Sequence, residues 1–220
     1  AALIRAGEDK SPEVRLLAVL ALSGKSSPES RNFLKTVAAR ESDPQIRKAA
    51  LNTSPLLSGN RRLLRDDPFW DYDIVKVGAF TLPETFLKFQ ADPIADGQSK
   101  GYQEAGFNDS GWKIIRFGDW RQQGYPEYRG TAWYRVQFAM PEKMEHNAVE
   151  LVLPEAAGNV WIWLNGVFAG ESENTENTRA LRFDVTAEIN WNARNELAVR
   201  VAGNGQVRGL LKPLVIEVLK

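Results

Sequence analysis

The sequence predicts a multidomain protein with an N-terminal segment of α-helical repeats and a C-terminal antiparallel β-sandwich. A chain of 220 residues has the length of one large domain or of two small ones. Apolar residues recur at helical spacing over residues 1–67, whereas apolar and polar residues alternate over residues 86–220. Six of the seven tryptophans follow residue 100, so composition also separates the two halves. Residues 68–85 are the predicted connector.

Residues 1–67 carry helix-start signals at regular intervals. A serine cap and a proline at positions 11–12 open an apolar pattern that predicts a helix over residues 12–23. The same opening returns as Asp43-Pro44, 32 residues after the first, and Ser27-Pro28 starts another helix between them. The pattern Asp-Pro-x-Ile-Arg-x-x-Ala at 43–50 resembles the second helix of HEAT repeats, which implies a helical hairpin from a longer solenoid. The alternative is an unrelated small helical bundle.

The connector, residues 68–85, is rich in aromatic residues. A flexible linker is rich in glycine and serine, whereas this segment offers Phe69, Trp70, Tyr72 and Phe80 for burial. We therefore predict a packed connector that holds the two domains in a fixed orientation.

The second half alternates between short apolar segments and turn residues, which is typical of an antiparallel sandwich. The nine predicted strands are 86–90, 114–117, 132–138, 148–153, 160–164, 167–169, 181–185, 196–201 and 214–219. Asn165-Gly166 is the signal of a two-residue hairpin turn, in which both central residues take positive φ angles. The strand before this turn then directs its aliphatic side chains to the core and Trp161 and Trp163 to the opposite face.

Five sequence blocks follow one another in this half. They are Phe107-Asn108-Asp109-Ser110-Gly111-Trp112, Gly130-Thr131-Ala132-Trp133-Tyr134-Arg135, Leu164-Asn165-Gly166, Phe183-Asp184-Val185-Thr186 and Arg194-Asn195-Glu196-Leu197-Ala198-Val199-Arg200-Val201. In this order they resemble the galactose-binding-like jelly roll that is the sugar-binding domain of glycoside hydrolase family 2 enzymes. The resemblance covers residues 86–220 and implies a jelly-roll fold. It also implies that the catalytic carboxylates lie in a separate barrel domain, so we predict no catalytic residue here.

Aromatic residues in the loop after Phe117 are the first candidate ligand site. Sugar recognition needs flat aromatic faces and a few polar groups that bind hydroxyls. The loop supplies the rings of Trp120, Tyr125 and Tyr128 and, as polar partners, Asp119 and Arg129. Because binding residues usually lie on loops of a rigid scaffold, we predict any sugar site at this loop.

The strand pair Trp161 and Trp163 is the second candidate ligand site. One interpretation is an exposed platform for a ligand. The alternative is burial against the helical domain or a neighbouring catalytic domain, because large exposed apolar patches are rare on isolated domains.

Charge and composition exclude several other functions. With 28 basic and 28 acidic residues the formal net charge is zero, which argues against nucleic acid or anionic lipid as a partner. No apolar run approaches the ~20 residues that span a bilayer, so no membrane partner is predicted. The absence of cysteine and the single His146 exclude disulfides, thiol catalysis and histidine metal clusters.

No cofactor is predicted. The acidic pairs lie in polar, turn-like segments, which favours solvated surface over glycoside hydrolysis. A structural calcium ion is an alternative to a turn-forming role for four residues with hard oxygen ligands, Asp92, Asp96, Asn108 and Asp109.

The function predicted from these patterns is a non-catalytic module that binds carbohydrate or organises domains in a larger carbohydrate-active protein. Its partners would be a carbohydrate and the neighbouring domains of the same protein. The chain begins with alanine and shows no leader, so we expect a piece of a longer protein; its compartment is unknown, and a carbohydrate ligand would favour an extracellular or periplasmic one. The alternative function is a protein-interaction module in which the repeats bind a partner and the sandwich is a cap.

Overall fold

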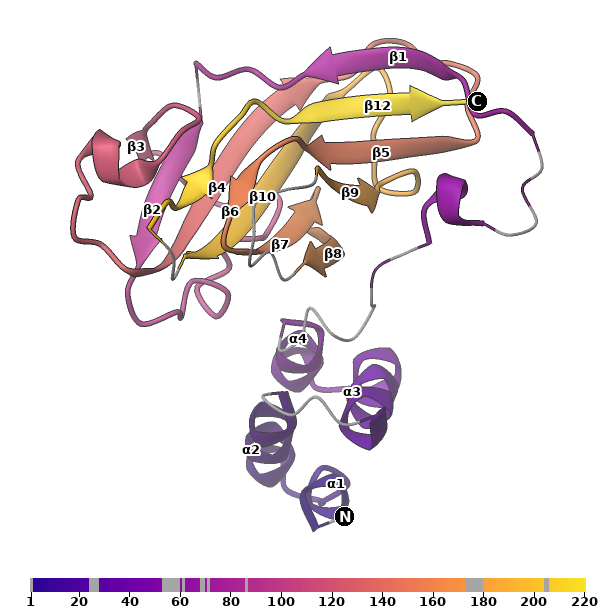
Figure 1. Cartoon of the computed structure of the whole chain (residues 1–220). Coiled ribbons are helices and arrows are strands. Elements are labelled where there is room, and N and C mark those ends of the chain that lie inside the picture. Colours follow the sequence, from indigo (N-terminus) through magenta and orange to yellow (C-terminus); the bar gives the residue numbers. More distant parts are fainter. Residues whose placement is uncertain are drawn as a thin grey trace. The chain divides into compact units, whose positions relative to one another are not determined.

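The chain folds into two compact units, residues 1–59 and residues 60–220 (Figure 1). The computed structural model describes residues 2–23, 28–52, 60, 62–67, 70, 72–85, 87–172, 180–203 and 206–220. The division falls before the predicted connector, and the described residues of the connector belong to the second unit. A fixed orientation of the two units stays a prediction.

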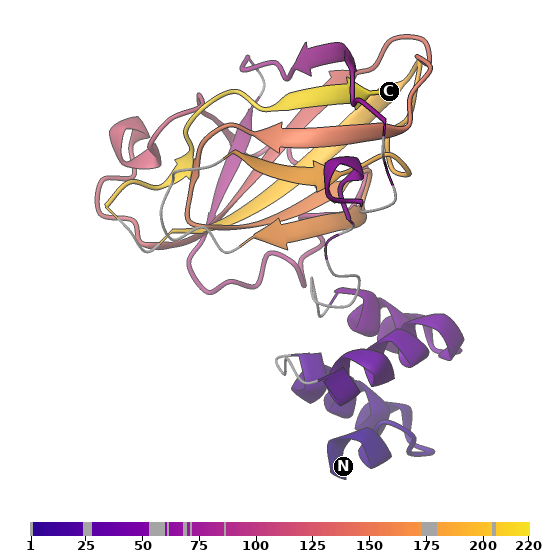
Figure 2. The ribbon, with the colours of Figure 1, turned by 45° about the vertical axis from the view of Figure 1, so that its right-hand side comes forward.

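The first unit is helical, as the start signals predicted. Its helices are α1 (Ala2–Ala6), α2 (Pro12–Ser23), α3 (Pro28–Arg40) and α4 (Pro44–Asn52), visible in Figure 2. Asp43 caps α4, because its Oδ1 accepts the N–H groups of Gln45 and Ile46 at 2.8 and 3.3 Å. The helices share a small core of Val19, Leu22, Leu34, Val37, Ile46 and Ala50. With four short helices, the resemblance to HEAT repeats is not supported, and no described helix has the length and apolarity to cross a membrane.

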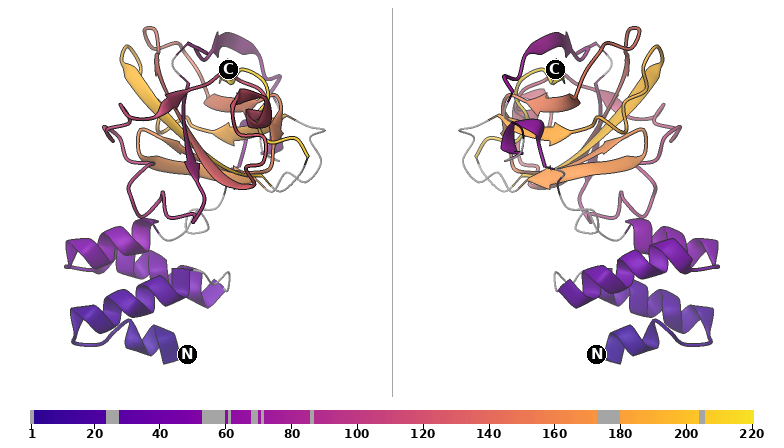
Figure 3. Two further views of the ribbon diagram at one scale, coloured as in Figure 1. Left: turned by 90° about the vertical axis from the view of Figure 1, so that its left-hand side faces the viewer. Right: turned by 90° about the vertical axis from the view of Figure 1, so that its right-hand side faces the viewer.

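The second unit consists of antiparallel sheets, which confirms the predicted class (Figures 1 and 3). The first sheet runs in the order β1 (Lys76–Thr81), β12 (Val215–Leu219), β5 (Ala148–Leu153) and β9 (Leu181–Asp184). The second sheet runs in the order β3 (Lys113–Ile114), β2 (Lys88–Asp92), β4 (Gly130–Ala139), β10 (Arg194–Gly203), β7 (Asn159–Leu164) and β8 (Val167–Ser172). A short pair joins β6 (Ala156–Ala157) to β11 (Gly209–Leu210). Each of the nine predicted strands overlaps an observed one, β1 lies in the connector, where Val75, Val77, Phe80 and Leu82 suggest short extended pieces, and β6 and β11 were not predicted.

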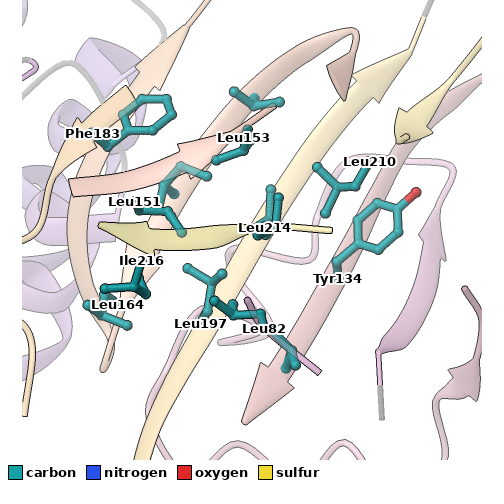
Figure 4. Packing of buried hydrophobic residues seen from close by; sticks show 14 of the residues in the cluster. Leu82, Tyr134, Leu151, Leu153, Leu164, Phe183, Leu197, Leu210, Leu214 and Ile216 are labelled. Carbon is teal, nitrogen blue, oxygen red and sulfur yellow. The ribbon is translucent and has the colours of Figure 1, made fainter. Parts of the chain in front are cut away.

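Aliphatic side chains from both sheets fill the space between them. Figure 4 shows Leu151 and Ile216 of the first sheet beside Leu164 and Leu197 of the second, all at most 1% exposed. Burial of one such side chain stabilises the fold by about 1.5–3 kcal/mol. The second sheet packs on this core with its inner face, and its outer face carries candidate ligand-binding side chains.

The predicted hairpin turn is confirmed. Leu164 pairs with Val167, and the two loop residues Asn165 and Gly166 have φ angles of 54° and 79°. The aliphatic residues of β7 lie in the sandwich core, whereas Trp161 and Trp163 belong to a separate cluster on the outer face of the second sheet.

Substitution of Gly166 by valine is expected to destabilise the sandwich by about 1–3 kcal/mol, because a β-branched residue is strained at positive φ. A Cβ atom there would also lie 3.0 Å from the backbone nitrogen of Ala105. Gly111→Val is the matched control, because a Cβ at Gly111 meets no atom within 4 Å. The midpoints of urea denaturation compare the two variants, and equal midpoints would contradict this account of the turn.

Residues 60–67 run along the sandwich and are fixed to both sheets. The side-chain amide of Asn60 accepts the N–H of Glu171 at 2.7 Å and donates to its carbonyl at 2.6 Å, on the edge strand β8. Arg65 belongs to the 3₁₀ helix η2 (Leu64–Asp66, Figure 2) and binds Glu150 of β5 through Nε and Nη2 at 3.2 and 2.9 Å. Arg182 bridges Glu150 and Glu217 at 2.9 and 2.7 Å. This ion network supplies guanidinium partners to the fully buried side chain of Glu150 on the outer face of the first sheet.

Candidate ligand-binding site

Trp120 is a core residue and not an exposed ring. It begins the 3₁₀ helix η3 (Trp120–Gln123) and has 0% exposure. Its ring centroid lies 5.7 Å from that of Phe89 and 5.9 Å from that of Tyr128. The expectation of an open ring here is therefore corrected: the loop folds its most apolar side chain into the sandwich, and a buried indole offers no face to a sugar.

The other aromatic residues of this loop pack on the same core. Tyr125 is half-buried, with its ring 4.8 Å from Phe89. The hydroxyl of Tyr128 accepts the N–H of Asp92 at 3.0 Å and donates to the carbonyl of Thr131, so both of its functions are used. Burial raises the pKa of Tyr128. The rings of Tyr125 and Tyr128 are therefore both only partly exposed.

The two polar residues predicted with these rings are not brought together. Asp119 is 8% exposed and binds Arg121 through its backbone N–H and its guanidinium at 3.1 and 2.7 Å. Burial acts to raise the pKa of Asp119, but the bonds from Arg121 outweigh it and hold that pKa below its ordinary value. Arg129 is exposed. The loop therefore forms no open constellation of aromatic and polar groups, and ligand binding there stays a prediction.

The outer face of the second sheet is covered by the chain itself. Trp163 is 4% exposed and lies with its ring 5.1 Å from Trp133 and 5.4 Å from Phe168. Tyr102, from the loop of residues 93–112, packs edge-on against Trp133 at 5.8 Å. Burial was the alternative expected for Trp163, but the expected cover was another domain. In the structure the rings beside Trp163 are those of Trp133 and Phe168 in its own sheet, and the loop of residues 93–112, which we call the covering loop, packs on Trp133.

Trp161 keeps part of its surface open. The guanidinium of Arg200, its neighbour on β10, lies 4.6 Å from the ring centroid, a cation–π distance. Burial lowers the pKa of Arg200. Trp161 is the strand residue that still fits the predicted platform.

The predicted calcium ligands are engaged with hydrogen-bond donors. Asp92 accepts Trp133 Nε1 and the Gly97 N–H at 2.9 Å each, and the Asp96 N–H at 3.0 Å. Asp109 binds Lys88 and Arg135. Within the described ranges, no three His, Cys, Asp or Glu side chains are grouped to hold a metal.

A cavity of ≈ 520 Å³ opens on the outer face of the second sheet, and we call it the polar cleft. Its charged residues come from β2, β4, β10 and the loop of residues 93–112. Alternation along β4 and β10 places Arg135, Gln137, Arg194 and Glu196 on one face, because core residues or the buried Asn195 separate them in sequence. The lining residues are Pro83, Lys88, Asp109, Arg135, Val136, Gln137, Phe138, Ala139, Arg194 and Glu196.

Arg135 lies at the base of the polar cleft with 2% exposure. Its Nε donates to Asp109 at 3.0 Å, and its Nη2 lies 2.9 Å from Glu196 Oε1 in a contact whose angles are poor for a hydrogen bond. Its Nη1 donates to the carbonyls of Tyr102 and Glu104 at 2.6 and 3.2 Å. The Arg135 side chain therefore holds in place Asp109, Glu196 and the loop of residues 93–112.

Glu196 is held as a carboxylate. It accepts the Gly106 N–H at 2.6 Å and the Gln137 amide at 3.0 Å, besides its contact with Arg135. Burial acts to raise the pKa of Glu196, but these donors and the charge of Arg135 hold it below its ordinary value. An ionised carboxylate accepts hydrogen bonds and does not act as a general acid.

Three charged residues of the polar cleft were missed as site residues by sequence reasoning, namely Lys88, Arg194 and Glu196, and Asp109 was considered only as a calcium ligand. A signal was present, because Asp109 and Glu196 lie in two of the quoted blocks. The alternation of β4 and β10 also places Glu196 on the face of Arg135.

Comparisons with solved structures find the fold of the second unit inside larger enzymes. A Bacteroides uniformis beta-glucuronidase is 24% identical with a TM-score of 0.52, and the match covers 64% of this chain and 18% of that one. A Ruminococcus gnavus beta-glucuronidase bound to a C6-substituted uronic isofagomine is 16% identical with a TM-score of 0.57, covering 70% and 30%. A glycosyl hydrolase family 2 member from Bacteroides cellulosilyticus is 20% identical with a TM-score of 0.51, covering 64% and 20%. The chain spans less than a third of each of these proteins.

Comparison with known families gives a match in the same region. No curated protein matches the chain. The model of the beta-galactosidase second all-beta domain matches residues 97–206, which include the covering loop and most strands of the second sheet. Because this match covers half of the 220 residues, the chain belongs to the family of the beta-galactosidase second all-beta domain.

Proposed function

We propose that residues 60–220 are a non-catalytic, galactose-binding-like jelly-roll module of a larger carbohydrate-active protein, in which it binds sugar and organises neighbouring domains. The observation that carries this proposal is the family match together with the short span of the chain: the same fold fills 18–30% of the glycoside hydrolases and glucuronidases it resembles. Neighbouring domains of the same protein are therefore the expected partners.

The chemistry of the acidic residues favours a non-catalytic role. Glycoside hydrolysis needs a carboxylic acid with a raised pKa opposite a second carboxylate. In the polar cleft Asp109 and Glu196 both contact Arg135, and the pKa of Glu196 is lowered. On the first sheet Glu150 and Glu217 share Arg182. Ion pairs with arginine suit these carboxylates to binding and to stability.

Binding of glycans to the full chain tests the sugar-binding part of the proposal. We expect a glycan screen to identify ligands with dissociation constants on the order of 10 μM to 1 mM, because a few hydrogen bonds and one or two ring contacts must offset the ordering costs. Titration of Trp161→Ala and Tyr125→Ala against the same glycan then separates the strand face from the loop, because each variant removes one partly open ring. A folded chain that binds no glycan would contradict the sugar-binding part.

The interaction-module alternative rests on the helical unit. Helix α2 exposes three large apolar side chains on one side, Val14, Leu17 and Leu20, with Leu17 67% exposed. Exposed apolar surface of this kind is typical of a protein contact. Absence of glycan binding by the folded chain would favour this alternative.

A further inference from the structure

We infer that the polar cleft is a binding site for a hydroxylated carboxylate, an acidic monosaccharide. This inference rests on the proposed function, because it names the ligand class and the place of binding. It differs from both predicted sites, since no candidate ring of the loop or of β7 lines the cleft.

The charges of the cleft leave one cation for a ligand. Three cations and two carboxylates line it. The charges of Asp109 and Glu196 are balanced by ion pairs with Lys88 and Arg135. Arg194 is exposed, and its side chain has no ion pair or hydrogen bond with any residue that the structure describes. A guanidinium binds a carboxylate through two parallel hydrogen bonds, so the acid group of the ligand would bind Arg194.

The two carboxylates of the cleft select for hydroxyl groups. Asp109 and Glu196 keep 14% and 15% of their side-chain surface exposed. A carboxylate has about four lone-pair positions, and the bonds to Lys88, Arg135, Gln137 and Gly106 leave some of them free on each side chain. These positions accept hydroxyl hydrogens, whereas they repel a bare anion. The ligand must therefore carry donors as well as its acid group.

The shape and rigidity of the cleft fit a small ligand. Its ≈ 520 Å³ lies within the roughly 300–1,000 Å³ typical of small-molecule sites. Pro83 and Ala139 supply apolar wall for the C–H face of a sugar ring. Because Arg135 is buried and bound on three sides, the two carboxylates are already in place before binding, which lowers the ordering cost.

Calorimetric titration of the full chain with galacturonate, galactose and acetate tests the inference. We expect galacturonate to bind about tenfold or more tightly than galactose, because one charge-assisted pair with Arg194 distinguishes the two sugars. Acetate should bind more weakly than galacturonate, since it offers no hydroxyl to Asp109 and Glu196. Arg194→Gln should lower galacturonate affinity to the level of galactose and leave galactose binding unchanged.

Two further variants sharpen the test. Gln137→Glu adds a negative charge to the exposed side of the cleft and should weaken galacturonate binding at least as much as Arg194→Gln. Arg129→Gln removes an exposed arginine outside the cleft and should leave all affinities unchanged. Melting curves check that each variant is folded, which we expect because all three side chains are exposed.

Several results would overturn the inference. They are equal affinity for galacturonate and galactose, affinity for acetate equal to that for galacturonate, absence of galacturonate binding, or Arg194→Gln binding like the wild type. Binding of a neutral glycan that is lost in Trp161→Ala, together with absence of galacturonate binding, would overturn this inference and leave the proposed function standing. Absence of any glycan ligand would contradict both.

Discussion

Replacement of Trp120 by alanine is expected to lower the free energy of unfolding by about 3–5 kcal/mol. The side chain is 0% exposed and packs against Phe89, Tyr128 and Tyr134. Its Nε1 also donates to the carbonyl of Tyr128 at 3.4 Å. Alanine would leave a cavity where the η3 loop closes the sandwich, and urea denaturation followed by circular dichroism measures the loss.

Tyr125→Ala is the control for this prediction. Its ring lies in the same loop but is half-buried, so a smaller loss of stability is expected. A Trp120→Ala variant with unchanged stability and reduced glycan binding would contradict the core assignment and restore the predicted stacking role.

Replacement of Arg135 by methionine is expected to destabilise the protein by about 3–5 kcal/mol, because it removes one partner of buried ion pairs. Asp109 would keep Lys88, but Glu196 would lose its only cationic contact among the described residues. The carbonyls of Tyr102 and Glu104 would also lose their donor. Hydrogen exchange of amides in residues 97–107 should become faster, because the covering loop is released.

Lys100→Met is the matched control. It removes a cation from the same loop, but its pair with Asp96 at 2.7 Å is largely exposed, and exposed pairs add little stability. A nearly unchanged midpoint of denaturation is expected. If Arg135→Met were as stable as Lys100→Met, the proposed anchoring of the loop by Arg135 would be wrong.

Local patterns predicted the strands and their faces well. The alternation of β7 and the Asn165-Gly166 turn depend only on neighbouring residues, and the structure confirms both. The start signals of α2 and α4 are equally local, since a capping side chain binds a backbone group two or three residues away.

The burial of the aromatic residues could not be predicted from the same patterns. Trp120 lies in a loop, and whether a loop folds inward depends on the space between strands distant in sequence. The polar cleft could not be predicted for the same reason, because its residues are distant in sequence. Arg135 contacts Tyr102, Asp109 and Glu196, which are 33, 26 and 61 residues away. Composition shows that these charges balance, but only the register of β4 against β10 shows which of them meet.

The contact between the Asn60 side chain and strand β8 affects the solubility of fragments of this chain. An uncovered edge strand presents free N–H and C=O groups on which further chains can add, which leads to aggregation. Asn60 occupies both backbone groups of Glu171 on this edge. A shortened protein that begins after Asn60 would uncover part of β8 and associate edge to edge, whereas one that includes it would retain a protected sheet.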